Sequence, residues 1–200
     1  MTSDAAYFDQ LYRADADPWQ VQSRWYEQRK RAVLLASLRQ ETYRNAFEPG
    51  CGTGELSAAL APRCQALLAC DFAPQAAGLA AARTADWPHV RVQTRSLPAQ
   101  WPADTEKTYD LIVVSELAYY LDAADLARFI ERCVASLAPE GELLACHWRH
   151  DFHDRRQATH AVHAAYDCHP ALTRLARHED PDFLLQTWHH TPAGPTKETP

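Results

Sequence analysis

The sequence predicts an α/β fold, in which a mainly parallel β-sheet is covered by helices on both faces. Seven short apolar runs follow one another between residues 46 and 188, and helical segments separate most of them. Strands that alternate with helices of about ten residues or more form βαβ units. The run at 111–114, LIVV, is apolar at every position. This pattern is typical of a parallel strand buried on both faces.

The elements are expected in the following order. An aromatic-rich, partly helical segment starts near residue 5 and ends at Asp17-Pro18-Trp19, and a stronger helix follows at about 23–39. Strands are predicted at 46–47, 66–71, 89–93, 109–116, 141–148, 172–177 and 182–188. Helices are predicted from about 55, after Pro74, at 122–137 and at about 154–167. The last two strands are close enough in sequence to be antiparallel neighbours.

A chain of 200 residues is most simply one domain. Residues 1–40 are interpreted as a helical N-terminal lid and residues 41–190 as the core to which it belongs. The Pro- and Thr-rich residues 191–200 are expected to be disordered.

Composition restricts the possible partners. The net charge of −6 disfavours nucleic acid and anionic membranes as binding partners, and a small-molecule or oligosaccharide substrate is expected instead. No apolar run approaches the ~20 residues of a membrane span. The six cysteines include no C-x-x-C pair, and the N-terminus lacks an apolar signal segment. A reducing cytoplasm is therefore predicted.

The stretch EPGCGTGE at 48–55 holds half of the six glycines. It follows a predicted strand and opens a predicted helix, and this context favours a ligand-binding loop over a simple tight turn. Glycines let a ligand approach the backbone, and the helix N-terminus supplies unpaired N–H groups.

The charges around this loop indicate which ligand it holds. Glu55 stands where a dinucleotide-binding loop would have its third glycine, and Glu48 precedes the loop. Carboxylates are unfavourable beside a pyrophosphate and suit a cation. About twenty residues further on, Asp71 ends the second predicted strand, at the spacing that places a carboxylate beside ribose hydroxyls. A ribose combined with a cation describes S-adenosylmethionine.

The chain resembles class I S-adenosylmethionine-dependent methyltransferases over about residues 5–190. The resemblance is carried by EPGCGTGE, ACDFAP, YDLIVVSELAYYL and LAPEGELLACHW. It implies a Rossmann-like, seven-stranded, mainly parallel sheet whose last strand is antiparallel. The segments LYRADADPWQVQSRWYEQRK, SELAYYL, HWRH and DFLLQTW resemble more narrowly the nodulation protein S (NodS-like) group. That group methylates the free amine of a deacetylated chitooligosaccharide.

The resemblance implies cofactor contacts for Trp19, Tyr26, Lys30, Glu48, Gly50, Gly52, Gly54, Asp71, Phe72, Ser96, Leu97 and Ser115. Glu48 would hold the α-amino end of S-adenosylmethionine, Asp71 the ribose and Phe72 the adenine. The turn 95–97 lacks the acidic residue that usually reads the adenine amine, so the Ser96 hydroxyl or a backbone N–H would replace it.

The lid contacts would come from the side chains of Trp19, Tyr26 and Lys30. A lid that excludes water protects the sulfonium and strengthens the local electrostatics.

Methyl transfer is an in-line displacement, in which positioning does most of the work. The predicted catalytic residues are Glu116, which would attract an ammonium acceptor, and His147, which would take its proton. Both stand at the carboxyl ends of predicted strands, at the edge where ligands bind in open α/β sheets. Tyr119, Tyr120, Trp148 and His150 are the predicted substrate contacts. Alternatively, Glu116 holds the cofactor or caps the next segment, and His147 is a structural histidine.

The histidines at 147, 150, 153, 160 and 163 suggest a metal site, but no cysteine pair accompanies them and no metal is expected. Three alternatives to N-methylation stay open: O-methylation of another metabolite, cofactor binding without catalysis, and a nicotinamide-dependent Rossmann protein. Slow conversion of bound cofactor to S-adenosylhomocysteine with a candidate acceptor would distinguish them.

Overall fold

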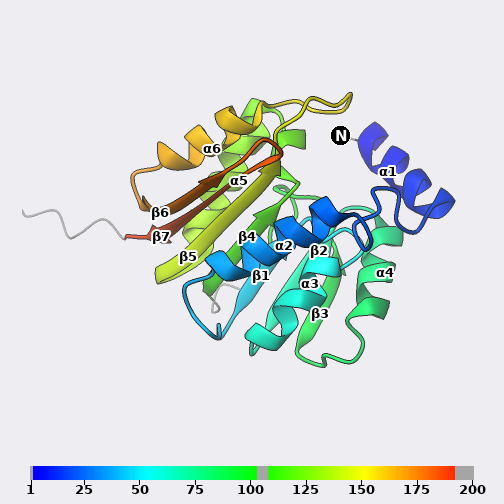
Figure 1. Cartoon of the computed structure of the whole chain (residues 1–200), viewed down its shortest axis with the longest axis horizontal. Coiled ribbons are helices and arrows are strands. Elements are labelled where there is room, and N and C mark those ends of the chain that lie inside the picture. Colours follow the sequence, from blue (N-terminus) through cyan, green and yellow to red (C-terminus); the bar gives the residue numbers. More distant parts are fainter. Residues whose placement is uncertain (1, 103–107, 192–200) are drawn as a thin grey trace, which may run out of the picture.

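The computed structural model describes residues 2–102 and 108–191 (Figure 1). The strands are β1 (Ala46–Pro49), β2 (Leu67–Asp71), β3 (Val90–Thr94), β4 (Tyr109–Ser115), β5 (Leu137–Trp148), β6 (Leu172–Glu179) and β7 (Phe183–His190). The α-helices are α1 (Thr2–Ala14), α2 (Trp25–Ser37), α3 (Glu55–Leu60), α4 (Pro74–Arg83), α5 (Ala123–Ser136) and α6 (Thr159–Asp167). Short 3₁₀ turns cover η1 (Ala61–Arg63) and η2 (Ala118–Tyr120).

The strands form one sheet in the order β3-β2-β1-β4-β5-β7-β6. Strands β1 to β5 pair in parallel, while β7 is antiparallel to both β5 and β6. The predicted fold class, including the antiparallel last strand, is confirmed. Because the first five strands are parallel, their carboxyl ends meet at one edge of the sheet.

Two elements begin furthest from their predicted starts. β5 begins at Leu137 rather than 141, because Leu137 pairs with Tyr109 before the register shifts. α6 begins at Thr159 rather than near 154, because the N–H groups of Arg156 and Gln157 donate to the carbonyl oxygen of Tyr119. Long-range contacts therefore override the local helical pattern there.

Each face of the sheet carries its own apolar core. On one face, α2 and α3 pack over Leu111 and Val113 of β4. On the other, α5 and α6 pack over Ile112 and Val114. All four side chains are fully buried, as expected for a strand covered on both sides.

Helix α1 lies beside the carboxyl edge of the sheet, and α2 crosses one face of it (Figure 1). In α1, Phe8 and Tyr12 pack against Ala73 and Ala76 at the start of α4. α2 buries Leu34 in the core. The interpretation of 1–40 as a lid stays a prediction. In the predicted tail, residues 192–200 lie outside the described residues.

The glycine loop joins β1 to α3. Gly50, Gly52 and Gly54 have φ angles of 74°, 52° and 81°, which side-chain-bearing residues rarely adopt. A Cβ on Gly54 would lie 2.7 Å from the Ala80 Cα, so this glycine lets α3 approach α4.

Gly54→Ala is expected to lower the free energy of unfolding by about 2–4 kcal/mol, because it combines a positive φ with overpacking. Urea denaturation measures this change. Gly78→Ala is the matched control, since a Cβ on Gly78 meets nothing within 4 Å within helix α4. The control should raise the free energy of unfolding by about 0.5–1 kcal/mol. Equal stability of the two variants would contradict the packing role of Gly54.

Candidate active site

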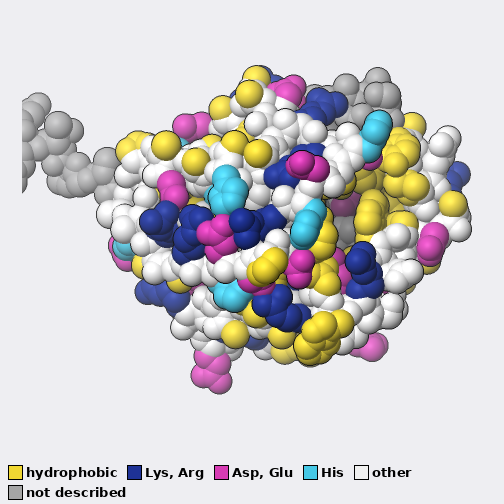
Figure 2. Space-filling model, turned by 45° about the horizontal axis from the view of Figure 1, so that its top comes forward, with side chains coloured by type: hydrophobic (Ala, Val, Ile, Leu, Met, Phe, Trp, Pro, Cys, Tyr) yellow, Lys and Arg dark blue, Asp and Glu magenta, His cyan; other side chains and the backbone are white. Residues whose placement is uncertain are grey.

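A cavity of about 830 Å³ opens at the carboxyl edge of the sheet. Its walls come from the glycine loop, from residues after β2, β3, β4 and β5, and from the N-terminal helices. Figure 2 shows a hollow on this side of the molecule, bordered largely by hydrophobic side chains. Both helices of the predicted lid therefore contribute to one site with the loop.

Asp71 fixes the glycine loop beside β2. One carboxylate oxygen accepts from the Gly52 N–H at 3.0 Å, and the other accepts from the Ala73 N–H at 2.9 Å. Burial raises the pKa of Asp71, and these backbone donors oppose that rise. Asp71 lines the cavity and keeps lone pairs for a ligand hydroxyl.

Glu48 lies at the floor of the cavity and is almost fully buried. The Ser57 hydroxyl donates to it at 2.6 Å. Burial raises the pKa of Glu48 to about 8, an effect that the Ser57 hydrogen bond opposes and the charge of Asp71 reinforces. A positive charge beside Glu48, such as a ligand ammonium, would therefore favour its ionised form.

Glu55 stands at the first position of α3, where its carboxylate forms an ion pair with Arg83 of α4. Its charge is therefore compensated within the protein. The predicted preference for a cation depends on Glu48 more than on Glu55.

The predicted adenine contacts Phe72, Ser96 and Leu97 all line the cavity. The Ser96 N–H donates to Gln100 Oε1 at 2.8 Å, so its hydroxyl is the group left to read an adenine edge. Phe72 also packs against Phe8 of α1, with ring centroids 5.3 Å apart. This side of the cavity thus links a predicted cofactor contact to the lid.

Trp19, Tyr26 and Lys30, the residues of the predicted lid contacts, line the cavity. Lys30 is buried, and its ammonium lies 2.6 Å from Glu116 and 2.9 Å from Glu27. Burial alone would lower the pKa of Lys30, but these two carboxylates raise it. Helix α2 therefore places the buried Lys30 ammonium between two carboxylates.

Glu116 has φ of 55° and directs its carboxylate into the cavity wall. One oxygen accepts from Lys30 and, at 3.4 Å, from the Tyr26 hydroxyl. The other accepts from the Tyr119 hydroxyl at 2.5 Å and the Trp148 N–H at 2.9 Å. Glu116 thus ties α2, β5 and the turn η2 together.

The structure does not bring His147 to the cavity. This side chain is fully buried and absent from the lining, and both ring nitrogens are hydrogen-bonded inside the protein. Burial also lowers its pKa well below the ordinary value. An acceptor cannot reach it, so the predicted role as a general base is not supported.

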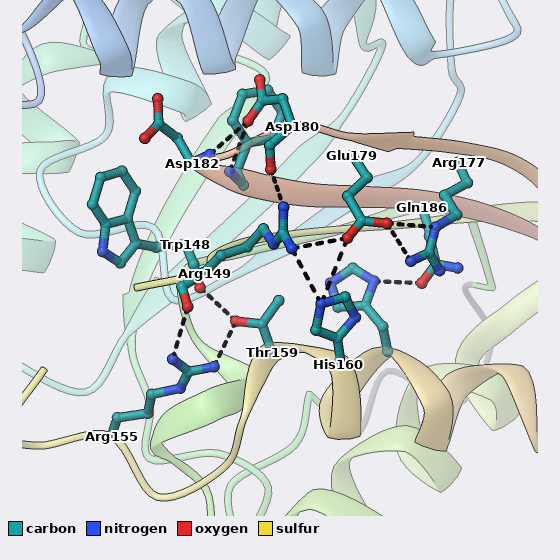
Figure 3. Close-up of polar contacts among 12 residues, drawn as sticks. Trp148, Arg149, Arg155, Thr159, His160, Arg177, Glu179, Asp180, Asp182 and Gln186 are labelled. Carbon is teal, nitrogen blue, oxygen red and sulfur yellow. Dashed lines mark hydrogen bonds and ion pairs between the residues drawn. The ribbon is translucent and has the colours of Figure 1, made fainter. Parts of the chain in front are cut away.

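The other predicted residues divide into two groups. Ser115, Tyr119, Tyr120 and Trp148 line the cavity together with Gly50 and Gly52. Gly54 and His150 do not: Gly54 serves the packing of α3 on α4, and His150 is half-exposed, 3.2 Å from Asp182. Figure 3 shows the Trp148 ring on the same side as Asp182, whose carbonyl oxygen accepts from the Arg149 N–H at 2.9 Å.

Sequence reasoning missed part of the cavity wall. Tyr7, Phe8, Leu11 and Tyr12 of α1 line it, as does the segment 152–156. The spacing 7, 8, 11 and 12 places these side chains on one face of a helix, and this was the available signal. The segment 152–156 carries no periodic pattern, so nothing local identified it.

Among residues 2–102 and 108–191, no group of three or more histidine, cysteine or acidic side chains is arranged to hold a metal ion. Within the same residues, no helix combines the length and apolar character needed to cross a membrane.

A model of the family described as nodulation protein S (NodS) matches residues 6–168. The chain belongs to the nodulation protein S family. The NodS protein of Bradyrhizobium diazoefficiens is 34% identical over 130 residues, covering 64% of this chain and 61% of that protein. The NodS protein of Sinorhizobium fredii is 32% identical over 133 residues, covering 66% and 60%. The matches thus span about three fifths of these relatives.

Two solved structures are similar over most of their length. A Pseudomonas syringae protein described as a methyltransferase is 52% identical, with a TM-score of 0.73 over 84% of this chain and 100% of that chain. The NodS N-methyltransferase of Bradyrhizobium japonicum WM9, in complex with S-adenosylhomocysteine, is 27% identical, with a TM-score of 0.82 over 93% and 98%. The predicted NodS resemblance is confirmed.

Glu48→Gln is expected to become more stable relative to the unmodified protein as pH rises from about 4.5 to about 8. In this window the folded state keeps a proton on Glu48 that the unfolded state, with a pKa near 4.5, releases. The free energy of unfolding of the unmodified protein therefore falls as pH rises, by at most about 1.4 kcal/mol per pH unit. Urea denaturation of both proteins at pH 5.5 and 8 measures the trend. A pH-independent difference would show that Glu48 titrates normally.

Proposed function

We propose that this NodS family member is an S-adenosylmethionine-dependent methyltransferase that acts on an amine of a small molecule or carbohydrate. The proposal rests on one observation, that a single continuous cavity connects two groups of residues. It joins the glycine loop, Glu48 and Asp71 to Glu116 and a wall of aromatic side chains. A cofactor and an acceptor can therefore meet in a single enclosed space.

The residues at the loop end fit S-adenosylmethionine, which when bound supplies the electrophilic methyl group. Gly50 and Gly52 present bare backbone to the cavity. Asp71 is oriented by two backbone donors and can accept from ribose hydroxyls. Glu48 would pair with the α-amino group and lose its proton as that ammonium binds.

The other end of the cavity suits an acceptor that carries an amine. Glu116 and Glu27 surround Lys30, so this wall already stabilises one ammonium group. Tyr120 and Trp148 expose ring surface that can pack against a sugar. We infer an amino sugar or a related oligosaccharide as the acceptor. Glu116 would orient its nitrogen, and the aromatic walls would exclude water.

The relatives support the cofactor more strongly than the acceptor. The B. japonicum NodS structure contains S-adenosylhomocysteine, the demethylated form of the cofactor, and its alignment covers 98% of that chain. The acceptor rests on the cavity wall of this protein and on the N-methyltransferase activity named for that relative.

S-adenosylhomocysteine is expected to bind with micromolar affinity in calorimetric titration, and NAD is expected not to bind. Asp71→Asn should weaken binding about 10- to 100-fold, because one charge-assisted hydrogen bond contributes about 1.5–3 kcal/mol. Titration at pH 7 in buffers of different ionisation enthalpy should detect proton release from Glu48. Preference for NAD would overturn the methyltransferase proposal.

Asp110→Asn is the matched control for this titration. Asp110 also accepts from two backbone N–H groups, those of Arg44 and Asn45, each at 2.8 Å. It does not line the cavity. The control should bind S-adenosylhomocysteine as the unmodified protein does, so a loss in both variants would indicate a general folding defect.

Glu116→Gln is expected to lower methyl transfer to a deacetylated chitooligosaccharide at least about ten-fold, because the acceptor amine loses a charged partner. Affinity for S-adenosylhomocysteine should change less than about three-fold. Transfer is measured from radiolabelled S-adenosylmethionine. Glu142→Gln is the control, since Glu142 likewise accepts a phenol, that of Tyr43, at 2.6 Å but lies outside the cavity. Unchanged transfer in Glu116→Gln would remove Glu116 from the acceptor site.

A further inference from the structure

A buried chain of hydrogen bonds runs from β7 to the turn that carries the acceptor-side aromatic residues. It begins at Gln186, whose Oε1 lies 2.6 Å from Nδ1 of His163 on α6. Nε2 of His163 lies 3.0 Å from Nδ1 of His147. Nε2 of His147 lies 3.2 Å from the backbone nitrogen of Ala118. All three side chains are buried, and none of them lines the cavity.

The Ala118 end sets the direction of the chain. A backbone N–H can only donate, so His147 Nε2 must accept and the His147 proton must lie on Nδ1. That proton is donated to His163 Nε2, which places the His163 proton on Nδ1. His163 then donates to the Gln186 carbonyl oxygen. Burial lowers the pKa of both imidazoles, that of His163 to about 4, and this agrees with two neutral rings at pH 7.

The Gln186 amide could also be turned, with its nitrogen toward His163 and its oxygen 3.2 and 3.3 Å from the guanidinium groups of Arg174 and Arg177. That orientation reverses both imidazoles and brings an N–H of His147 against the N–H of Ala118. The two arginine side chains are 46% and 39% exposed and can turn into solvent. The Ala118 backbone is buried and cannot move away, so the first orientation is favoured.

Figure 3 shows Gln186 beside Arg177, whose guanidinium group reaches Glu179 on β6. Gln186 therefore lies at the junction between the outer surface of β6–β7 and the buried imidazoles. In the favoured orientation its amide nitrogen faces Asp167 at 3.5 Å.

The Ala118 amide, at the end of this hydrogen-bond chain, belongs to the turn η2, directly before the two tyrosines of the cavity wall. The Tyr119 ring packs on His147 with centroids 5.2 Å apart, and its hydroxyl donates to Glu116. Tyr120 packs against Tyr119 at 4.9 Å. The loop end of the cavity, with Asp71 and the glycines, makes no hydrogen bond to this chain among the described contacts.

We propose that Gln186 is a positioning residue: it accepts the last proton of a hydrogen-bond chain whose direction the Ala118 N–H sets, and so holds His163, His147 and through them the acceptor side of the cavity in place. The functional half of this proposal rests on the proposed methyl transfer. The tautomer half rests on the hydrogen-bond geometry alone, so the two halves can fail separately.

The tautomers are tested directly by NMR of protein labelled with ¹⁵N-histidine at pH 7. His147 and His163 are both expected as neutral rings that carry the proton on Nδ1. Gln186→Met removes the acceptor of the His163 Nδ1 proton at similar volume, so it should shift the His163 Nδ1–H signal and speed hydrogen exchange of that proton and of the Ala118 amide. Protonation of His147 on Nε2 in the unmodified protein would overturn the proposal, whatever the activity of the protein.

The functional consequence is tested by methyl transfer to a deacetylated chitooligosaccharide. Gln186→Met should lower kcat/KM for this acceptor about ten-fold and leave the affinity for S-adenosylhomocysteine within about two-fold. Gln186→Glu keeps an acceptor for His163 and should restore most of the rate. Equal losses of acceptor turnover and S-adenosylhomocysteine affinity in Gln186→Met would indicate a merely structural role and overturn the proposal.

Thr187→Val is the matched control on the same strand. Thr187 is buried, and its hydroxyl has no hydrogen-bond partner among the described residues. The control should leave the tautomers, the Ala118 exchange and the rates unchanged. If the unmodified protein binds no S-adenosylhomocysteine, the proposed function fails. The NMR result still decides whether the hydrogen-bond chain from Gln186 to Ala118 exists.

Discussion

The carboxylate of Glu116 joins parts of the chain that are far apart in sequence. It receives Lys30 from α2, Tyr119 from the turn η2 and the Trp148 N–H from β5. The positive φ of Glu116, 55°, is unfavourable by about 1–2 kcal/mol for a residue other than glycine. The charge-assisted hydrogen bonds that its carboxylate accepts offset this cost. The acceptor wall of the cavity and the inner end of the predicted lid therefore depend on one side chain. Removing it would leave the Lys30 ammonium with Glu27 as its remaining carboxylate partner.

The two ends of the cavity manage charge in different ways. At the loop end, Glu48 is buried with no ion-pair partner among the described residues, and burial raises its pKa to about 8. At the acceptor end, Lys30 already compensates Glu116. A cationic ligand at the loop end can pair with the Glu48 carboxylate. A cationic ligand at the acceptor end must compete with the Lys30 ammonium for Glu116. This asymmetry favours a cationic ligand at the loop end over one at the acceptor end.

Features that depend on short stretches of sequence were predictable. The order of strands and helices, the glycine loop and Asp71 follow from local patterns, because turns, helix starts and strand ends are encoded within a few residues. Gly54 and His147, predicted to contact the cofactor and to take the acceptor proton, lie outside the cavity wall, because their positions depend on partners distant in sequence. Gly54 meets Ala80, and His147 meets Ala118 and His163. The motif position identified each residue, but only the packing shows which way each one faces.

The same contrast applies to the acceptor side as a whole. Backbone groups at the ends of β1 and β2 form the loop end, so fold and glycine pattern determine it together. The acceptor side is assembled from side chains on α1, α2, η2 and the segment 152–156, whose relative positions depend on the complete core. A neutral histidine buried there donates one N–H and accepts at its other ring nitrogen, and each of these hydrogen bonds has a fixed partner. Its orientation can therefore depend on a glutamine that does not line the cavity.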